Sequence, residues 1–226
     1  PKAAMKLSGA AVMYRPNPSL IWLDSTTNGK AWLNPYADAA KNYLIDIAGE
    51  AADMGFSEIL LANVQFPDNN SSASYYGAAS SSVSQSQALM NFVTQMRDAM
   101  EAKDVTVRVL SDGLAAAGGE NTIYGSVNPV TWSGADMVVD LRISQLGRNL
   151  VVGEETIADP SADPAAAIEA LAAGMNAAGV EPTCILDADS DDLSGQIAAL
   201  TDAGFSDFIL SRESGSYTAG ELTIDQ

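Results

Sequence analysis

Acid–base chemistry in this chain has to proceed without histidine, because the sequence contains none, and it contains a single cysteine, Cys184. The missing histidine excludes Ser-His-Asp and Cys-His mechanisms. A reactive thiol normally needs a histidine or a similar base, so Cys184, which lies in an apolar run, is interpreted as a small core residue. One thiol also excludes an internal disulfide and a cysteine-based zinc site. Any general acid or base is therefore Asp, Glu, Tyr or Lys.

Four acidic residues stand at or just after the ends of apolar runs that have the character of strands: Asp112, Asp140, Asp187 and Glu213. Asp112 is the first candidate, because Ser111-Asp112-Gly113 follows its strand at once. Asp140 has Arg142 two residues further on, on the same strand face, which would make it structural. The alternative for each acid is a solvated loop residue or a helix cap.

Strands and helices alternate along the chain. The expected strands are Glu58–Val64, Val105–Leu110, Ala135–Ile143, Thr183–Leu186 and Phe208–Ser211, with a further one near Ala10–Tyr14. The expected helices are Tyr36–Met54, Ala88–Met100, 164–178 and Asp191–Ala203. Such alternation predicts a parallel sheet with right-handed crossovers in a single domain, residues 1–226. Loops after strands are long and polar, as in a TIM-barrel-like (β/α)8 fold, whose working face those loops build. About six strands are found, so two are missed or the opening part of the barrel is lacking.

One phrase occurs twice. Residues 53–61 read Asp-Met-Gly-Phe-Ser-Glu-Ile-Leu-Leu, and residues 202–210 read Asp-Ala-Gly-Phe-Ser-Asp-Phe-Ile-Leu. Gly55 and Gly204 are expected to end a helix in the left-handed conformation, which glycine adopts at little cost. The phrase is either an internal repeat or the ordinary form of a helix-to-strand joint.

The net charge of −18 is uneven, because residues 154–226 hold 15 Asp and Glu against one Arg. This acidity argues against binding nucleic acid or docking on anionic lipid, whose phosphates it would repel. It suits a secreted or surface protein that meets neutral ligands, or it serves solubility alone.

No apolar run approaches a membrane span in length. Pro1–Leu7 does not resemble a signal peptide, although a processed chain would have lost one.

The stretch from Trp32 to Pro67 resembles a bacterial glycoside hydrolase family of (β/α)8 barrels that was long catalogued as a domain of unknown function. The matching segments are Trp32-Leu33-Asn34-Pro35-Tyr36, Tyr43-Leu44-Ile45-Asp46-Ile47-Ala48, Glu50-Ala51-Ala52, Gly55-Phe56-Ser57-Glu58-Ile59 and Phe66-Pro67. Gln196-Ile197-Ala198-Ala199, Asp202-Ala203-Gly204-Phe205 and Tyr217-Thr218 resemble the last helix and strand of the family. The resemblance implies the barrel fold and a polysaccharide ligand.

The sequence departs from the family at the residues that carry chemistry. The signature strand of the family resembles Phe-Asp-Tyr-Val-Arg-Phe-Pro, whereas this chain has Leu61-Ala62-Asn63-Val64-Gln65-Phe66-Pro67. Alanine cannot act as nucleophile or base, and glutamine carries no charge to orient a carboxylate. The Pro-Met-x-Tyr stretch of the family is replaced by Val139-Asp140-Leu141-Arg142.

Glycoside hydrolysis needs two carboxyl groups about 5–10 Å apart. The resemblance therefore makes Asp112, Asp140 and Glu213 the catalytic candidates. The substrate-binding candidates are Asn63, Gln65, Tyr75, Tyr76, Trp132 and Asp187. Sugars stack on aromatic rings such as those in the loops, with loop anchoring as the alternative role.

Two functions follow from these residues. The first is a glycoside hydrolase-like barrel that acts on or binds polysaccharide and has lost part of its chemistry. The second is a non-catalytic module that binds glycan or protein at a bacterial surface, outside the cell.

No cofactor or metal is expected. Asp187–Asp192 resembles a calcium loop, but Asp192 stands where glycine is required and Ala198 where a bidentate Glu is required, so a helix cap explains it better. The oligomeric state stays open.

Overall fold

The computed structural model describes residues 32–67, 82–212 and 215. The predicted strand near Ala10–Tyr14 and the candidates Tyr75, Tyr76 and Glu213 lie outside these residues. The chain divides into two compact units, of which unit 1 is built mainly from residues up to Val109 and unit 2 mainly from residues 136 onward. Short segments between Leu110 and Ala135 belong to one unit or the other. Each unit is described by itself.

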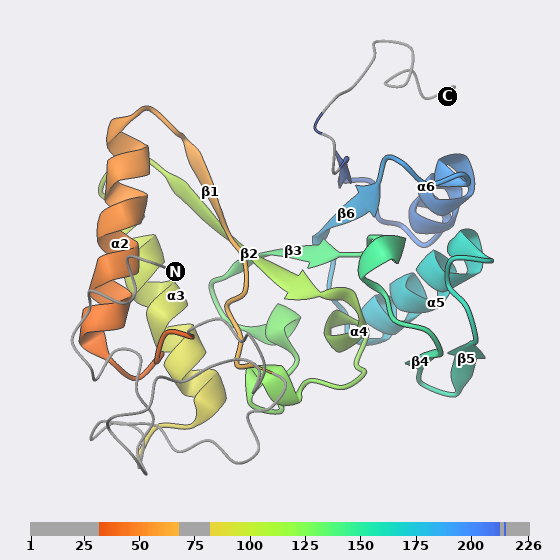
Figure 1. Cartoon of the computed structure of the whole chain (residues 1–226), viewed down its shortest axis with the longest axis horizontal. Helices are drawn as coiled ribbons and strands as arrows, with labels where there is room; N and C mark the ends of the chain where they lie inside the picture. The colour runs from red at the N-terminus through yellow and green to blue at the C-terminus, as the bar shows by residue number, and fades with distance from the viewer. Residues whose placement is uncertain (1–31, 68–81, 213–214, 216–226) are drawn as a thin grey trace. The chain divides into compact units, whose positions relative to one another are not determined.

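Unit 1 contains a helix-strand-helix-strand sequence (Figure 1). Its elements are α2 (Asp38–Asp53), β1 (Glu58–Leu61), α3 (Gln85–Glu101), the first part of β2 (Thr106–Asp112) and the 3-10 turn η4 (Thr122–Tyr124). β1 and β2 pair in parallel, with Glu58 opposite Thr106 and Leu61 opposite Val109. The predicted strand Glu58–Val64 ends early because Asn63 has a φ of 58°, which turns the chain out of the strand conformation.

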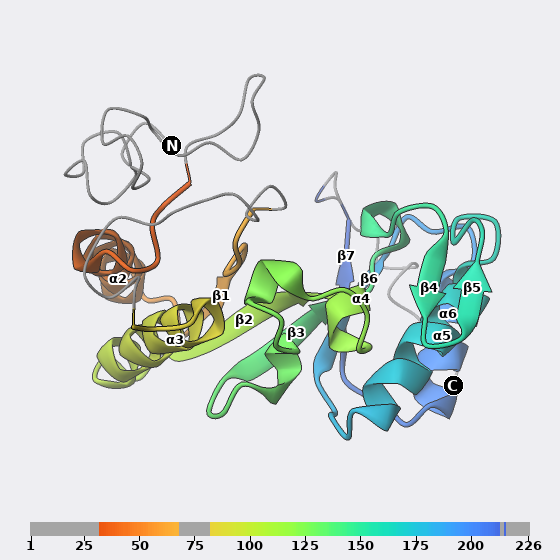
Figure 2. The same ribbon diagram turned by 90° about the horizontal axis from the view of Figure 1, so that it is seen from below.

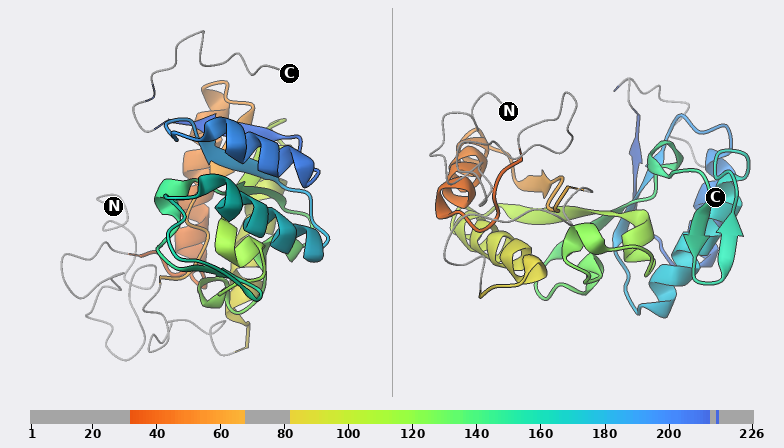
Figure 3. Two further views of the ribbon diagram at one scale, coloured as in Figure 1. Left: turned by 90° about the vertical axis from the view of Figure 1, so that its right-hand side faces the viewer. Right: turned by 60° about the horizontal axis from the view of Figure 1, so that its bottom comes forward.

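Unit 2 contains the other strands and two helices that lie side by side, as Figures 2 and 3 show. Its elements are α4 (Gly113–Ala116), the turn η5 (Pro129–Thr131), β3 (Asp136–Asp140), the turn η6 (Ile143–Gln145), β4 (Leu150–Val152), β5 (Glu155–Ile157), α5 (Pro164–Ala177), β6 (Thr183–Asp187), α6 (Leu193–Asp202) and β7 (Phe208–Ser211). β3, β6 and β7 are parallel neighbours. The strand order is β1-β2-β3-β6-β7, and β2 belongs to both units.

The strands of unit 2 bury one face in the core and turn the acidic residues at their ends to the other face. Val139, Cys184 and Leu186 are fully buried in one apolar cluster with α5 and α6. Successive residues of a strand point to opposite faces, so Asp140 and Asp187 face away from those helices. Asp140 pairs with Ile185, which places Asp187 two residues further along the neighbouring strand. Both carboxylates therefore lie on one face, at the C-terminal ends of adjacent strands.

Two features of unit 2 differ from the sequence-based prediction. The strand predicted to reach Ile143 ends at Asp140, where the carboxylate accepts a 3.2 Å hydrogen bond from the Arg142 N–H and turns the chain. The antiparallel hairpin β4–β5 is missing from the prediction. Its two-residue loop begins at Gly153, whose φ of 60° is a conformation that glycine adopts at little cost.

The repeated phrase forms the same joint in both units. Gly55 and Gly204 each have a φ of 96°, which confirms the predicted left-handed ends. The Gly55 N–H donates to the Ala52 carbonyl at 2.9 Å, and the Gly204 N–H donates to the Thr201 carbonyl at 2.9 Å. The phenylalanines that follow differ in surroundings, because Phe56 is 59% exposed and Phe205 is 3% exposed. No helix among the described residues is long and apolar enough to cross a membrane.

Candidate functional site

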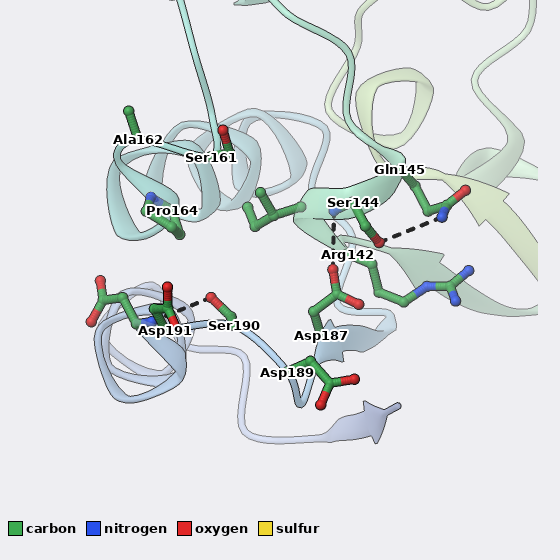
Figure 4. Close-up of a pocket in the computed structure, with 12 residues that line it drawn as sticks. Arg142, Ser144, Gln145, Ser161, Ala162, Pro164, Asp187, Asp189, Ser190 and Asp191 are labelled. Carbon is green, nitrogen blue, oxygen red and sulfur yellow. Dashed lines mark hydrogen bonds between the residues drawn. The ribbon is translucent and has the colours of Figure 1, made fainter. Parts of the chain in front are cut away.

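A polar cleft of about 910 Å³ lies in unit 2 where β3 and β6 end (Figure 4). We call it the polar cleft, and its lining residues are Arg142, Ile143, Ser144, Gln145, Ser161, Ala162, Pro164, Asp187, Asp189, Ser190, Asp191 and Asp192. Three segments contribute them, namely the turn after β3, the start of α5 and the loop between β6 and α6. Loops after parallel strands form the ligand-binding side of α/β proteins, so the position suits a functional site.

Arg142 in the polar cleft is held by the last residue of β3. Its Nε donates to Asp140 Oδ1 at 2.8 Å and its Nη2 to Asp140 Oδ2 at 2.6 Å. The Asp140 side chain is only 13% exposed and that of Arg142 28% exposed. Such a two-pronged ion pair fixes both side chains. The predicted pairing of Asp140 with Arg142 is thereby confirmed, and the carboxylate that was a catalytic candidate is engaged by a guanidinium.

Asp187 and Asp112 also accept hydrogen bonds from the backbone. Asp187 Oδ2 accepts from the Ser144 N–H at 3.0 Å, which ties the end of β6 to the turn after β3. Asp112 Oδ1 accepts from the Ala115 N–H at 2.9 Å and so caps the short helix α4. The helix-cap alternative therefore describes Asp112 in this structure.

The remaining carboxylates of the polar cleft are divided between structural contacts and solvent. Asp189 pairs with Arg212 at 2.7 Å. Asp192 caps α6, with its Oδ1 accepting from the Gly195 N–H at 3.2 Å, which confirms the predicted cap. Asp191 is exposed. Four aspartates against one arginine make the lining anionic.

Ser161 borders the polar cleft from the start of α5. Its hydroxyl donates to Asp159 Oδ1 at 2.5 Å, and its N–H donates to the same oxygen at 3.1 Å. The Ser161 hydroxyl, and then its N–H, hold the pKa of the Asp159 carboxyl below the usual value. With its proton used in this way, the Ser161 oxygen presents lone pairs to its surroundings.

A second hollow of about 820 Å³ lies in unit 1, between α2, β1 and α3. We call it the apolar groove, because most of its lining is aliphatic or aromatic, including Leu44, Ile47, Leu60 and Phe92. Ala62, Asn63 and Gln65 line it at the end of β1, and none of the described residues that line it is Asp or Glu. The position of the family acid is thus occupied by a methyl group beside two amides.

The amide of Gln65 belongs to a network with buried aromatic residues. The Tyr124 hydroxyl lies 3.4 Å from Gln65 Oε1, and Trp32 Nε1 donates to the Gln65 carbonyl at 3.1 Å. Trp132 packs edge-on against Tyr124 with ring centroids 5.9 Å apart and is 4% exposed. This packing fits the loop-anchoring alternative for Trp132 better than sugar stacking.

The predicted site residues therefore fall into separate groups. Asn63 and Gln65 meet in the apolar groove, and Asp187 lies in the polar cleft. Asp140 touches the polar cleft only through Arg142, and Asp112 does not line it. Tyr75, Tyr76 and Glu213 are outside the described residues. The sequence analysis did not single out Ser144, Gln145, Ser161 or Ser190 for binding, although each follows a strand or precedes a helix.

The lining of the polar cleft sets what it can bind. Hydroxyl and amide groups from Ser144, Gln145 and Ser190 stand beside carboxylates that accept hydrogen bonds. Such a surface suits a ligand rich in hydroxyl groups and disfavours phosphates. No group of three or more Asp, Glu or Cys residues that could hold a metal ion is present in the part of the chain that the structure describes.

Comparison with known protein families gives a match over residues 10–123, just over half of the chain, to the family described as "Putative glycosyl hydrolase domain". The chain belongs to this family. The predicted resemblance is thereby confirmed, and the chain is a glycoside hydrolase-like protein. The match includes β1, Ala62 and Gln65 in the segment that follows it, and most of the elements of unit 1.

Comparison with solved structures gives the glycoside hydrolase domain of PgaB (BpsB) from Bordetella bronchiseptica, with a TM-score of 0.63 and 11% sequence identity. The likeness covers 93% of this chain and 66% of that domain. At this identity it concerns the fold, and it confirms the predicted class, a mixed α/β protein related to part of a (β/α)8 barrel. No curated protein matches the chain.

Proposed function

We propose that this protein binds polysaccharide in the polar cleft and does not hydrolyse it. The observation that carries the proposal is the engagement of the candidate acids. Asp140 is held by Arg142, Asp112 caps α4, and Asp187 accepts the Ser144 N–H. A hydrolase needs one carboxyl group free to donate a proton and a second free to attack or to activate water.

The residues that follow β1 give independent support for the absence of hydrolytic activity. Ala62 and Gln65 replace the acid and the arginine of the family signature, and the residues that line the apolar groove include no carboxylate among those described. Glycan binding does not require these groups. A cleft with hydroxyl, amide and carboxylate groups bonds sugar hydroxyls in either direction, as donor and as acceptor.

The second candidate function is hydrolysis by Asp140 and Asp187. They share one face of the sheet on adjacent strands, with a register that separates their Cα atoms by about 8 Å, from a strand spacing of about 4.8 Å and a rise of about 3.3 Å per residue. This separation is compatible with a carboxylate pair. It becomes productive only if Asp140 leaves Arg142.

Binding is tested with a panel of polysaccharides on affinity gels. We expect at least one to retard the protein, and we expect Gln145→Ala to weaken its binding about fivefold or more, from the loss of about 1 kcal/mol of hydrogen bonding. Gln145 is exposed, and its side-chain amide donates to the Ser144 hydroxyl at 3.5 Å on the protein surface, so truncation of this side chain is expected to leave the fold intact. Gln87→Ala, at an exposed glutamine of α3, is the matched control.

Hydrolysis is measured as release of reducing ends from the same panel. We expect none. Release that disappears in both Asp140→Asn and Asp187→Asn would establish the second candidate instead. Neither retention nor release on any polysaccharide would contradict both.

We also propose that the protein works outside a bacterial cell or on its surface and does not bind nucleic acid. The net charge of −18 and the anionic lining of the polar cleft argue against nucleic-acid binding, because both repel phosphate backbones. The location is proposed because an acidic surface suits a secreted or surface protein that meets neutral ligands. Immunodetection in culture medium, surface and cytosolic fractions tests the location, and a cytosolic protein would contradict it.

A further inference from the structure

Gln196 is a fully buried amide next to the polar cleft. It lies in the first turn of α6, and none of its surface is exposed. Its Nε2 donates to Ser190 Oγ and, at 3.2 Å, to the Asp192 carbonyl oxygen. A carbonyl oxygen can only accept, so the end of the amide that faces Asp192 must be the NH2 group. Gln196 is therefore held in the orientation in which it donates to Ser190.

The Ser190 hydroxyl is given a direction by these contacts. The Asp192 N–H also donates to Ser190 Oγ, at 3.3 Å (Figure 4). A hydroxyl oxygen has two lone pairs and one proton, so the two donors occupy both lone pairs and leave the proton to donate. None of the described residues accepts that proton. Because Ser190 lines the polar cleft, the proton is directed to a ligand in the cleft.

This polarity is opposite to that of Ser161, which lines another segment of the polar cleft. The Ser161 hydroxyl donates to Asp159 Oδ1, so its oxygen accepts. One serine of the lining therefore offers lone pairs and the other offers a proton. A ligand that satisfies both must present a hydrogen-bond donor to Ser161 and an acceptor to Ser190.

The other end of the Gln196 amide makes this arrangement unfavourable for folding. Gln196 Oε1 is buried and accepts no hydrogen bond from the described residues. A buried acceptor without a donor destabilises the folded state. The partners of Nε2 do not need it, because the Asp192 carbonyl also accepts the Gln196 N–H at 3.1 Å and Ser190 Oγ also accepts the Asp192 N–H. Packing alone therefore favours an apolar side chain here, and the amide is explained by a role in the cleft.

We propose that Gln196 is a positioning residue of the polar cleft, which fixes the Ser190 hydroxyl as a hydrogen-bond donor to the ligand. The ligand group selected in this way is an oxygen with a lone pair to share, such as the ring, glycosidic and hydroxyl oxygens of neutral polysaccharides. Without the amide, the Ser190 hydroxyl can rotate and the selection is lost. The inference rests on the proposed function, because its ligand is the polysaccharide of the polar cleft.

The test compares affinity with stability. Affinity gels contain dextran, laminarin, galactomannan or arabinoxylan, and the polysaccharide that retards the wild type most is used for the variants. Ser190→Ala should weaken binding about fivefold, the loss expected from one hydrogen bond. Gln196→Met should weaken it about threefold or more, because a hydroxyl that rotates donates only part of the time. The Tm of Gln196→Met should equal or exceed that of the wild type, because the unsatisfied acceptor is gone.

Two residues of α6 that do not line the polar cleft provide matched controls. Leu200 is fully buried, so Leu200→Met alters the packing of the helix with little change in volume. Ser194 is exposed, so Ser194→Ala removes a hydroxyl from the surface of the same helix. Both variants should bind as the wild type does.

The double variant shows whether Gln196 acts through Ser190. With both Gln196→Met and Ser190→Ala, binding should be no weaker than with Ser190→Ala alone, because the amide then has no hydroxyl to orient. Losses that multiply in the double variant would give Gln196 a separate role and overturn the proposal.

The remaining outcomes separate this proposal from the proposed function. A clear fall in the Tm of Gln196→Met would make Gln196 a structural residue and overturn the proposal. Retardation of the wild type with unchanged binding in either single variant would also overturn it, and the proposed function would stand. If none of the polysaccharides retards the wild type, the proposed function fails and this inference fails with it.

Discussion

At the residue scale, each candidate acid that the structure describes has a structural partner. Asp140 illustrates how far sequence reasoning reaches, because its pairing with Arg142 follows from a spacing of two on one strand and is confirmed. The contact between Asp187 and the Ser144 N–H joins residues 43 positions apart and has no such local signal. Local spacing therefore predicted one partner, while tertiary folding determined the other.

The same limit applies to the aromatic residues. Trp132 is a loop residue that the sequence offered for sugar stacking or for loop anchoring, and the structure shows its ring packed on Tyr124 with only 4% of the residue exposed. Burial of a loop side chain depends on which other loop covers it, and the local amino-acid composition does not predict that contact.

Cys184 should make the stability of the protein depend on alkaline pH. Burial raises the pKa of its thiol to about 12, from an ordinary value of about 9. The folded state therefore keeps a proton that the unfolded state releases. The free energy of unfolding is unaffected by this group below about pH 8, falls by about 1.4 kcal/mol per pH unit above pH 9, and levels off near pH 12.

Urea unfolding at pH 8 and pH 10.5 measures this effect. We expect the wild type to lose about 2 kcal/mol more than Cys184→Ala between the two values. The variant is less stable at both because it leaves a cavity, so the difference in slope is the informative quantity. Parallel losses in the two proteins would show that Cys184 does not titrate in this way.

At the element scale, the sequence predicts the presence of long helices and strands with a regular apolar pattern better than it predicts the residues at which they end. The four helices that were predicted, α2, α3, α5 and α6, lie within a few residues of the expected limits, because apolar spacing and caps such as Asp192 mark them, whereas the short α4 was not predicted. Strand ends shift where side chains intervene, as Asp140 does for β3 and Asn63 for β1. The hairpin β4–β5 is missed because each of its strands has three residues, too few for a periodic signal.

Two helical glycines should respond in opposite directions to replacement by alanine. A Cβ at Gly49 in α2 would meet only Lys103 Cε at 3.8 Å, so Gly49→Ala should stabilise the protein by about 0.5–1 kcal/mol through helix propensity. A Cβ at Gly174 in α5 would lie 2.5 Å from the Ala117 carbonyl oxygen. Gly174→Ala should therefore destabilise by about 1–3 kcal/mol.

Thermal or urea unfolding of the two variants checks this contrast, and each serves as the control for the other. Stabilisation by both would mean that α5 does not approach the backbone of Ala117 as closely as described. Destabilisation by both would place Gly49 under a constraint that its surroundings do not show.

At the scale of the whole molecule, the alternation of strands and helices was sufficient to predict the fold class, which the likeness to a glycoside hydrolase domain confirms. The prediction of one domain over residues 1–226 stays a prediction beside the two compact units. The order of strands and helices along the sequence predicts the fold class. The division into compact units depends on contacts between segments that are distant in the sequence, and the order of elements does not give those contacts.

Charge is the other property of the whole molecule. Residues 154–226 carry a net charge of −14, so mutual repulsion should weaken unit 2 at low ionic strength. Raising NaCl from 20 to 300 mM should increase its Tm by about 3 °C, equivalent to about 1 kcal/mol, as screening reduces the repulsion.

Calorimetry with a variant carrying Glu169→Gln, Glu181→Gln and Asp202→Asn tests the cause, because all three residues are exposed in unit 2. The variant should melt at a higher temperature than the wild type at 20 mM NaCl and gain less from added salt. An equal gain in both proteins would exclude repulsion among these charges.

The twin joints at Gly55 and Gly204 show that one short phrase encodes the same bend whether its phenylalanine is in solvent or in the core. The bend is therefore a property of local sequence and not of its surroundings. Exchanging residues 53–61 with residues 202–210 should change what the phenylalanine touches without changing the path of the backbone. The phrase is, in effect, a transferable connector with which further βα units could be appended to this protein.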